Sequence, residues 1–274
     1  MSVSQTEKAL AFKALHQGPA AFVIANAWDA GSARFLAGSG FPALATSSAA
    51  AANILGRVDG TITRDDSLAQ ALAIVSASDL PVSADLENGF GVAPEVVAET
   101  IRRAAEAGLV GGSIEDATGN PERPLFDVGH AAERVQAAVE AAMALPFPFM
   151  LTARAENFVE GKPDLDDTIM RLQAYESAGA DVLFAPGLPD LDAVRAVCSS
   201  VSKPVNFMVG IKGKSFTVRE LESAGVRRIS LAASLFRAAM TGLRNAAKEV
   251  REQGTFGYLD DMMSSQEWNT FMKG

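Results

Sequence analysis

The segment Val82-Ser-Ala-Asp85-Leu-Glu87-Asn-Gly89-Phe-Gly91 joins a short β-prone run to two carboxylates and two glycines. A run that turns polar so abruptly is typical of a buried parallel strand whose carboxyl end opens into a functional loop. Gly89 and Gly91 would let that loop fold tightly. The segment therefore predicts one strand of a parallel sheet with acidic side chains at its end.

Outward from this strand, four segments share one pattern, in which an amphipathic stretch ends in Ala-Gly or Ser-Gly and a short β-rich run follows. They are Leu36–Ala45, Ala105–Glu115, Ser177–Ala185 and Ser223–Leu231. The pattern is typical of a helix that glycine closes at its C-terminal cap, followed by a strand entering a buried parallel sheet.

The whole chain then has eight predicted strands: Phe22–Ala25, Ala43–Thr46, Val82–Asp85, Gly112–Glu115, Phe149–Arg154, Val182–Phe184, Val205–Met208 and Arg228–Leu231. Helical patterns fall between them at Ser67–Ser78, Pro94–Ala107, Ala131–Met143, Leu165–Ala178, Leu188–Ser199 and Ser234–Glu252. This α/β alternation over about 250 residues predicts a (β/α)₈ TIM barrel, with a doubly wound open sheet as the alternative.

No linker rich in Gly, Ser or Pro divides the 274 residues, so we expect a single barrel domain over residues 1–274. The tail from Gly254 to Gly274 carries Phe256, Tyr258, Met262, Met263, Trp268 and Phe271. Because this tail is too apolar to remain in water, we expect a C-terminal helical extension that packs on the barrel or on another subunit.

The net charge of −9 and pI near 4.8 argue against nucleic acid as a partner, because phosphate binding needs clustered Lys and Arg. The single cysteine, Cys198, excludes an intramolecular disulfide and favours a reducing, cytoplasmic location. The segment Met1–Leu10 lacks the features of a signal peptide, and no apolar stretch approaches the length of a membrane span.

Acidic side chains and an arginine follow three neighbouring predicted strands: Asp85 and Glu87 the third, Glu115 the fourth and Arg154 the fifth. Function in a barrel collects at the carboxyl ends of the strands, so these groups are expected to converge. Converging carboxylates repel and raise one another's pKa, and a hard divalent cation relieves that repulsion. We therefore predict a Mg²⁺ site.

Arg154 adds a planar fork that can hold a substrate carboxylate through two parallel hydrogen bonds. A 2-oxo acid held by both the metal and this arginine would have negative charge on its oxo oxygen stabilised. The pattern indicates chemistry through a metal-stabilised enolate.

Each of these residues also has a purely structural interpretation. Asp85 and Glu115 could be solvated loop acids or helix caps, and Arg154 could form a structural bridge to Glu156 or Asp116. The only histidines, His16 and His130, are expected on helices as surface residues, and Cys198 is expected to be a buried small apolar group.

These motifs together resemble the isocitrate lyase and phosphoenolpyruvate mutase superfamily, from about Asn26 to Arg237. The remaining matches are Asn26-Ala-Trp-Asp-Ala-Gly-Ser-Ala-Arg34, Glu115-Asp116 and Ala-Arg154-Ala-Glu-Asn-Phe. The family pattern after the third strand is Asp-x-Asp-x-Gly-Tyr-Gly, so Glu87 and Phe90 depart from it conservatively. The resemblance implies a (β/α)₈ barrel that binds Mg²⁺, often in tetramers that exchange a terminal helix between subunits.

The resemblance also implies roles for particular residues. Asp85 would bind the metal directly, and Glu87 and Glu115 would bind it largely through water. The implied substrate-binding residues are Ser47, Ser48, Arg154, Asn206 and Arg237, the implied catalytic residues are Asp59, Arg154 and Ser48, and Asp59 would lie on a mobile gating segment.

Three departures narrow the reaction. The loop Ala117–Pro124 lacks the cysteine of the isocitrate and methylisocitrate lyases, and Pro186 replaces their glutamate. Ala117 also replaces the lysine of the phosphonomutases. We therefore expect a Mg²⁺-dependent carbon–carbon lyase for a small 2-oxo or 2-hydroxy carboxylic acid, acting by decarboxylation, hydrolysis or retro-aldol cleavage.

Two alternatives remain open, a P–C bond enzyme of the phosphoenolpyruvate mutase type and a non-catalytic barrel that binds metal or oxalate. The expected partners are a small carboxylate and further copies of the chain, as a dimer or tetramer, without nucleic acid or membrane.

Overall fold

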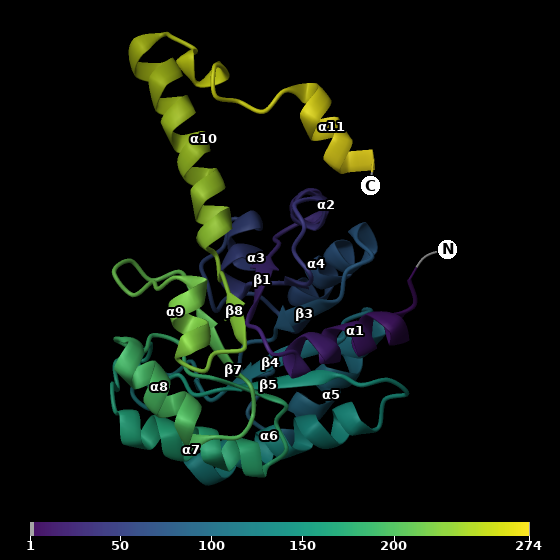
Figure 1. Cartoon of the computed structure of the whole chain (residues 1–274), viewed down its shortest axis with the longest axis vertical. Helices are drawn as coiled ribbons and strands as arrows, with labels where there is room; N and C mark the ends of the chain where they lie inside the picture. Colours follow the sequence, from purple (N-terminus) through teal and green to yellow (C-terminus); the bar gives the residue numbers. More distant parts are fainter. Residues whose placement is uncertain (1–2, 274) are drawn as a thin grey trace.

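The computed structural model describes residues 3–273 of the chain. Eight parallel strands pair in chain order, and β8 returns to β1 to close a barrel (Figure 1). The strands are β1 Phe22–Asn26, β2 Leu44–Ala45, β3 Val82–Asp85, β4 Gly111–Glu115, β5 Met150–Arg154, β6 Val182–Phe184, β7 Val205–Met208 and β8 Arg228–Ser230. The TIM-barrel prediction is confirmed, and the open-sheet alternative is wrong.

Helices alternate with these strands. They are α1 Gln5–Gln17, α2 Ala30–Gly38, α3 Ser48–Ile54, α4 Arg64–Ala77, α5 Pro94–Glu106, α6 Val128–Met143, α7 Leu165–Ser177, α8 Leu191–Ser200, α9 Val218–Ser223, α10 Ser234–Gln253 and α11 Ser265–Lys273, with a short 3₁₀ turn at Gly257–Leu259. The predicted helices are present with small shifts at their ends, and His16 lies on a helix as expected, whereas α3 was not predicted.

Helix α1 packs against the amino-terminal ends of the strands. Phe12 of α1 and Phe22 of β1 enclose the His16 ring, with ring centroids 4.7 Å (Phe12) and 5.0 Å (Phe22) from it. His16 is only 4% exposed, so the prediction of a surface histidine is wrong for this residue. The reason is that one face of α1 closes the floor of the barrel, which leaves the carboxyl ends of the strands as its open end.

Helix α10 extends away from the barrel and leads to α11 (Figure 1). Phe236 is the only residue of α10 that is buried. The tail returns through α11, where Trp268 stacks on Phe35 of α2 at 6.1 Å and Phe271 packs on the same ring at 4.5 Å. The amphipathic face of α10 therefore remains largely exposed, while α11 contacts the barrel side.

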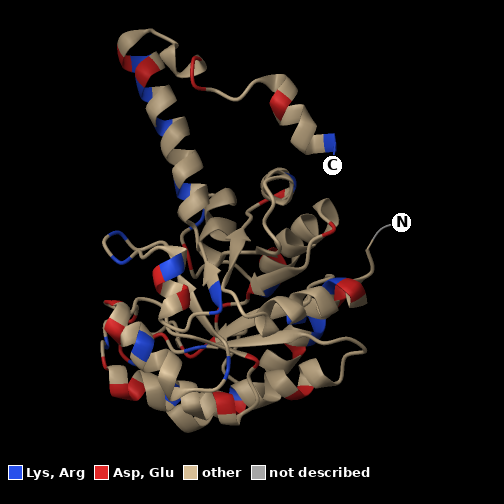
Figure 2. Cartoon of the chain, in the orientation of Figure 1, with Lys and Arg blue, Asp and Glu red and all other residues tan. Residues whose placement is uncertain are grey.

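Figure 2 shows both signs of charge interspersed over the outer helices, with Lys and Arg residues spaced along α10. Among residues 3–273, none of the helices is both long and apolar enough to span a membrane.

Candidate active site

The predicted acidic groups meet at the open end of the barrel because three neighbouring strands end in them. Asp85, Glu115 and Arg154 are the last residues of β3, β4 and β5. The register places Asp85 opposite Ser113, and Glu115 directly opposite Arg154. Since the strands are parallel, all three side chains are delivered to the same rim.

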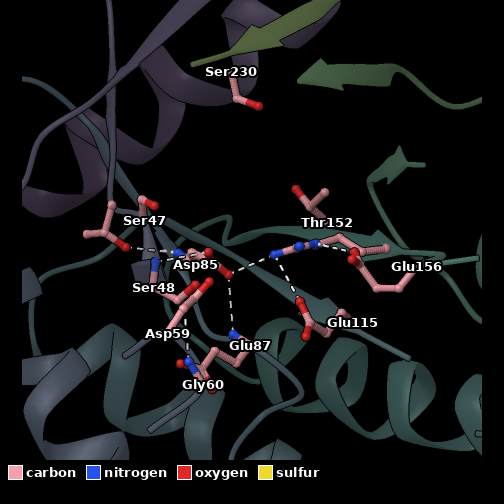
Figure 3. Close-up of polar contacts among 12 residues, drawn as sticks. Ser47, Ser48, Asp59, Gly60, Asp85, Glu87, Glu115, Thr152, Glu156 and Ser230 are labelled. Carbon is pink, nitrogen blue, oxygen red and sulfur yellow. Dashed lines mark hydrogen bonds and ion pairs between the residues drawn. The ribbon is translucent and has the colours of Figure 1, made fainter. Parts of the chain in front are cut away.

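The Arg154 guanidinium lies at the centre of this group. Its Nη1 is 2.8 Å from Asp85 Oδ1 and 3.0 Å from Glu115 Oε2, and its Nε donates to Glu156 Oε1 at 2.8 Å (Figure 3). Burial opposes the charge on Arg154, but Glu115, Glu156 and Asp85 outweigh it and raise the pKa of the guanidinium well above its usual value. The structural ion pair between Arg154 and Glu156 that the sequence left open is present. Arg154 also forms ion pairs with Asp85 and Glu115.

The carboxylates carry more negative charge than one guanidinium balances. Burial raises the pKa of Glu115 well above its usual value, although Arg154 opposes the shift. Burial, with Asp85 and Asp59 nearby, raises the pKa of Glu87 to about 7. A second cation at this rim would favour the ionised form of these groups.

Two residues of the loop after β3, one of them acidic, have an uncommon backbone conformation. Glu87 and Phe90 have φ of 48° and 60°, in the left-handed region that non-glycine residues rarely adopt. Gly89 has φ of 78°, and a Cβ added at Gly91 would lie 2.5 Å from Val96 Cγ1. The glycines therefore permit the tight loop, and its conformation turns the Glu87 carboxylate toward the other acids.

Asp85 is fixed by its neighbours as well as by Arg154. Its Oδ2 accepts from the backbone N–H of Ser48 at 3.0 Å, and its Oδ1 accepts from the backbone N–H of Glu87 at 3.3 Å (Figure 3). The backbone N–H of Asp85 donates to Thr46 Oγ1 at 2.9 Å. The carboxylate of Asp85 is thus held in place before any ligand arrives.

The donor set suits a hard divalent cation. Asp85, Glu87 and Glu115 offer only oxygen atoms, and Oε1 of Glu87 is buried with no hydrogen-bond partner among the described residues. No three Asp, Glu, His or Cys side chains between residues 3 and 273 are arranged as direct ligands around one point. The oxygen donors of Asp85, Glu87 and Glu115 are of the kind that Mg²⁺ prefers, together with several waters.

A pocket of about 670 Å³ opens above the carboxylates. Ser47, Ser48, Asp59 and Arg237 line it together with the acids. Ser47 caps α3, and Asp59 lies on the exposed loop between α3 and α4, where its Oδ1 accepts from the Gly60 N–H at 3.1 Å. Arg237, near the start of α10, is exposed at the edge.

Asn206 is the one predicted site residue that does not line this pocket. It lines a smaller inner cavity of about 80 Å³, below the carboxylates. There its Nδ2 donates to Ser230 Oγ at 3.0 Å and its Oδ1 accepts from Arg228 Nε at 2.8 Å. The role of Asn206 as a substrate contact, which the resemblance implies, stays a prediction.

Sequence analysis missed two features of the site. Asp116 is 2% exposed and accepts from Tyr175 at 2.5 Å, from Arg171 at 3.1 Å and from the Glu156 N–H at 2.9 Å. Arg228 lies inside the barrel on β8, and an arginine in a predicted buried strand was the signal that could have revealed it.

The fold and the site together define a class of TIM-barrel proteins that gather carboxylates and one arginine at the carboxyl ends of adjacent strands. The chain belongs to the phosphoenolpyruvate phosphomutase family, whose model matches residues 12–251, within the isocitrate lyase and phosphoenolpyruvate mutase superfamily. The resemblance inferred from the motifs is thereby confirmed.

Three relatives illustrate the family. A Burkholderia cenocepacia J2315 structure, named provisionally as a lyase/mutase, is 52% identical with a TM-score of 0.96, over 98% of this chain and 97% of that chain. The 2-methylisocitrate lyase of Escherichia coli K12 is 32% identical over 79% of this chain and 75% of its own length. The 2,3-dimethylmalate lyase of Eubacterium barkeri is 29% identical over 91% of this chain and 89% of its own length.

Proposed function

We propose that this chain is a Mg²⁺-dependent carbon–carbon lyase that acts on a small 2-oxo or 2-hydroxy carboxylic acid through an enolate-type anion. The observation that carries the proposal is the group of Asp85, Glu87 and Glu115 carboxylates around Arg154 on the floor of the open pocket. The names of two relatives, 2-methylisocitrate lyase and 2,3-dimethylmalate lyase, support a lyase.

The proposed metal site uses Asp85 as the direct ligand, with Glu87 and Glu115 acting through water. This assignment agrees with the fixed Asp85 carboxylate and with the unpartnered Oε1 of Glu87. Magnesium, when bound, supplies positive charge next to an oxo oxygen that becomes negative in the reaction.

Arg154 is proposed to orient the substrate carboxylate. Glu156 holds Nε of Arg154 at 2.8 Å, so the Nη1 atom faces the side of the pocket where Asp85 and Glu115 lie. Since Nε and Nη1 already donate to three carboxylates, the substrate carboxylate is proposed to accept from the Nη2 donors.

The remaining residues are proposed to bind the substrate and move its proton. The backbone around Ser47 and Ser48 would hold an anionic group, and the Ser48 hydroxyl would return a proton to the carbon that loses its substituent. Asp59 on its exposed loop would cover the pocket, and Arg237 would attract the anion at its edge.

The loop between β4 and α6 favours a reaction without a thiol acid. Its segment from Ala117 to Leu125 closes as an antiparallel bridge and contains no cysteine. Pro186 lines the pocket after β6 and offers no acid there. Decarboxylation of an oxaloacetate-like acid or retro-aldol cleavage of a small 2-hydroxy diacid fits these residues best.

A second candidate is a P–C bond enzyme, which the description of the matching family model favours. Ala117 counts against it, because this residue stands directly after the Glu115-Asp116 pair and lacks any basic group. The P–C bond reaction would be favoured if phosphonopyruvate competed for binding in the pocket and oxalate did not.

The test begins with a thermal-shift panel of oxaloacetate, oxalate, substituted malates, phosphonopyruvate and methylisocitrate, each with and without Mg²⁺, because a ligand of the native state raises Tm. Turnover of the substrate identified in this way is then measured. Asp85→Ala is expected to lower kcat/KM about a thousandfold or more and to abolish the response to Mg²⁺.

The matched control is Asp79→Ala, which removes an exposed carboxylate that precedes β3 at the opposite end of the barrel. This variant is expected to retain the kcat/KM of the unmodified chain. Turnover that persists in the presence of a chelator would refute the metal role.

We also propose a cytoplasmic homo-oligomer, either a dimer or a tetramer. The proposal rests on the exposed apolar residues of α10 and the tail, which include Met240, Leu243 and Phe256 at 44%, 59% and 57% exposure, and on the single, half-buried Cys198. A second copy that covers these residues would remove their apolar surface from water.

A further inference from the structure

The barrel interior contains an arginine, Arg228, that forms no ion pair with any other residue between 3 and 273. Arg228 is 5% exposed and lines the inner cavity of about 80 Å³. Its Nε donates to Asn206 Oδ1 at 2.8 Å and its Nη2 donates to Thr152 Oγ1 at 3.0 Å, and both partners are neutral. Its Nη1 is buried and has no hydrogen-bond partner among the described residues.

The ionisable neighbours of Arg228 do not supply a negative charge. Burial and the nearby Arg154 lower the pKa of Arg228 to about 9, so the guanidinium still carries its charge at neutral pH. Burial and Arg228 itself lower the pKa of His16 to about 3, so the imidazole at the barrel floor is neutral. A buried charge without a counter-charge is destabilising, and an anion would relieve it.

Asp85 lines the same cavity, but its carboxylate is paired with Arg154 and not with Arg228. Oδ1 accepts from Arg154 at 2.8 Å and Oδ2 accepts from the Ser48 N–H at 3.0 Å. Arg154 in turn contacts three carboxylates, whereas Arg228 contacts none among residues 3–273. Of the two arginines that line this inner cavity, Arg228 is therefore the one without a partner of opposite charge among residues 3–273.

The inner cavity is next to the open pocket. Asp85 and Arg154 line both spaces, as do Ser47, Met208 and Ala232. The two spaces therefore adjoin along these five shared residues. The volume of about 80 Å³ exceeds that needed for one water and suits a single small polar group.

We propose that the inner cavity is a binding site for one small monovalent anion of carboxylate size, with Arg228 as its charge partner. Asn206 and Thr152 hold the guanidinium across the barrel so that Nη1 remains available. The anionic group comes either from the second carboxyl of a dicarboxylic substrate or from a free anion such as formate or chloride.

The first experiment measures the Tm of the metal-free chain against sodium formate and sodium chloride, at constant ionic strength set by a bulky sulfonate salt. A saturable rise in Tm is expected for the unmodified chain. Arg228→Met is expected to abolish this rise without lowering Tm in the absence of the anion, because it removes an unbalanced buried charge.

The matched control is Arg227→Met, the same substitution at the preceding residue, whose guanidinium instead donates to Pro19 O at 2.6 Å. This variant is expected to keep the full response. A flat titration of the unmodified chain, or an unchanged response in Arg228→Met, would overturn the proposal.

A second variant guards against loss of folding in Arg228→Met. Arg228→Lys keeps the charge but removes the planar fork, and it is expected to weaken formate binding about ten- to a hundredfold. Formate binding of undiminished affinity in this variant would also contradict the proposed contact.

The source of the anion is then determined by competition, using malate and its monocarboxylic counterpart lactate in the presence of Mg²⁺. If the substrate's second carboxyl occupies the cavity, formate weakens malate binding but not lactate binding. If the occupant is a free anion, formate weakens neither. The formate titration needs neither turnover nor metal, so a failure of the proposed lyase activity would leave the anion site independently testable.

Discussion

Glu87 is the residue at which strain, burial and charge coincide. Its φ is 48°, its Oε1 has no partner among residues 3–273, and burial together with Asp85 and Asp59 raises its pKa to about 7. A strained residue persists only where the surrounding structure imposes it, and such residues concentrate at functional sites. The backbone conformation of the loop after β3 is therefore expected to influence how tightly the site binds a cation, because it sets the position of the Glu87 carboxylate.

The raised pKa of Glu87 predicts how the metal-free chain responds to pH. The folded state binds more protons than the unfolded state between the ordinary pKa of 4.5 and about 7. The stability contribution of Glu87 is therefore fully present below pH 4.5 and is lost as pH rises to about 7. The expected loss is about 1–2 kcal/mol after allowance for solvent screening, measured by urea denaturation with a chelator present.

Glu87→Gln is expected to reduce this pH dependence by the share of Glu87, since the amide does not titrate, whereas Glu115 and Asp116 still do. Bound Mg²⁺ should make stability rise with pH, because the cation favours the ionised carboxylates. The rise in Tm on adding Mg²⁺ is therefore expected to be larger at pH 8 than at pH 5.5. An identical pH profile for Glu87→Gln and the unmodified chain would contradict the assignment.

At the scale of elements, Asp116 connects the end of β4 to α7 and to the segment after β5. Tyr175 and Arg171 of α7 and the backbone of Glu156 all donate to its carboxylate. Burial nevertheless raises the pKa of Asp116, which shows that these donors only partly compensate for its removal from water. The Asp116 network thus fixes the backbone of Glu156 just after β5, and the Glu156 side chain in turn positions Arg154.

Tyr175→Phe tests this connection by removing only the hydroxyl. Loss of a hydrogen bond to a buried carboxyl is expected to lower the free energy of unfolding by about 1.5–3 kcal/mol, as measured by urea denaturation. The control is Tyr258→Phe, because Tyr258 is 37% exposed and its replacement is expected to change stability by less than about 0.5 kcal/mol. Equal effects of the two substitutions would exclude a role for the Asp116 network.

The strands were easier to predict than the helices and the layers of the site. Short β-prone runs such as Val82–Asp85 and Val205–Met208 appear with the expected ends because each is bounded by glycine, proline or charge. Helix α3 was missed because Ser48–Ile54 is an alanine-rich segment of only seven residues without apolar periodicity. Pairing of β4 with β5 follows from the barrel, so the meeting of Glu115 and Arg154 was predictable.

The inward direction of individual side chains was harder to predict. Asn206 and Arg228 face each other across β7 and β8 in an inner layer, and the depth of a residue in a barrel depends on the stagger between strands rather than on local sequence. His16 was misplaced for a related reason, because only the closed barrel provides the floor against which it packs. Tertiary context decides these positions.

At the scale of the whole molecule, the long helix α10 is buried against the barrel only near its start, at Phe236. Met240 and Leu243 lie on it at 44% and 59% exposure. If a second copy covers this helix as proposed, Met240→Glu with Leu243→Glu should weaken self-association more than about a hundredfold, because two apolar side chains lose their burial. Light scattering coupled to size-exclusion chromatography measures the mass.

The control for this pair is Asn245→Glu, which adds a negative charge at an exposed polar position of the same helix. It is expected to leave the assembly intact, and the barrel of the double variant should retain its far-UV circular dichroism. A monomeric unmodified chain, or a double variant of unchanged mass, would argue against an interface on α10.

The pairing of β8 with β1 has a consequence for how the chain is made. About two hundred residues separate Phe22 from its partner Arg228, so β1 leaves the ribosome long before its second neighbour exists. At typical translation rates of ~5–20 residues per second, one edge of β1 waits roughly 10–40 seconds for closure. During that interval the nascent chain presents an open strand to other nascent chains, which makes chaperone binding during synthesis most useful before Ser230 emerges.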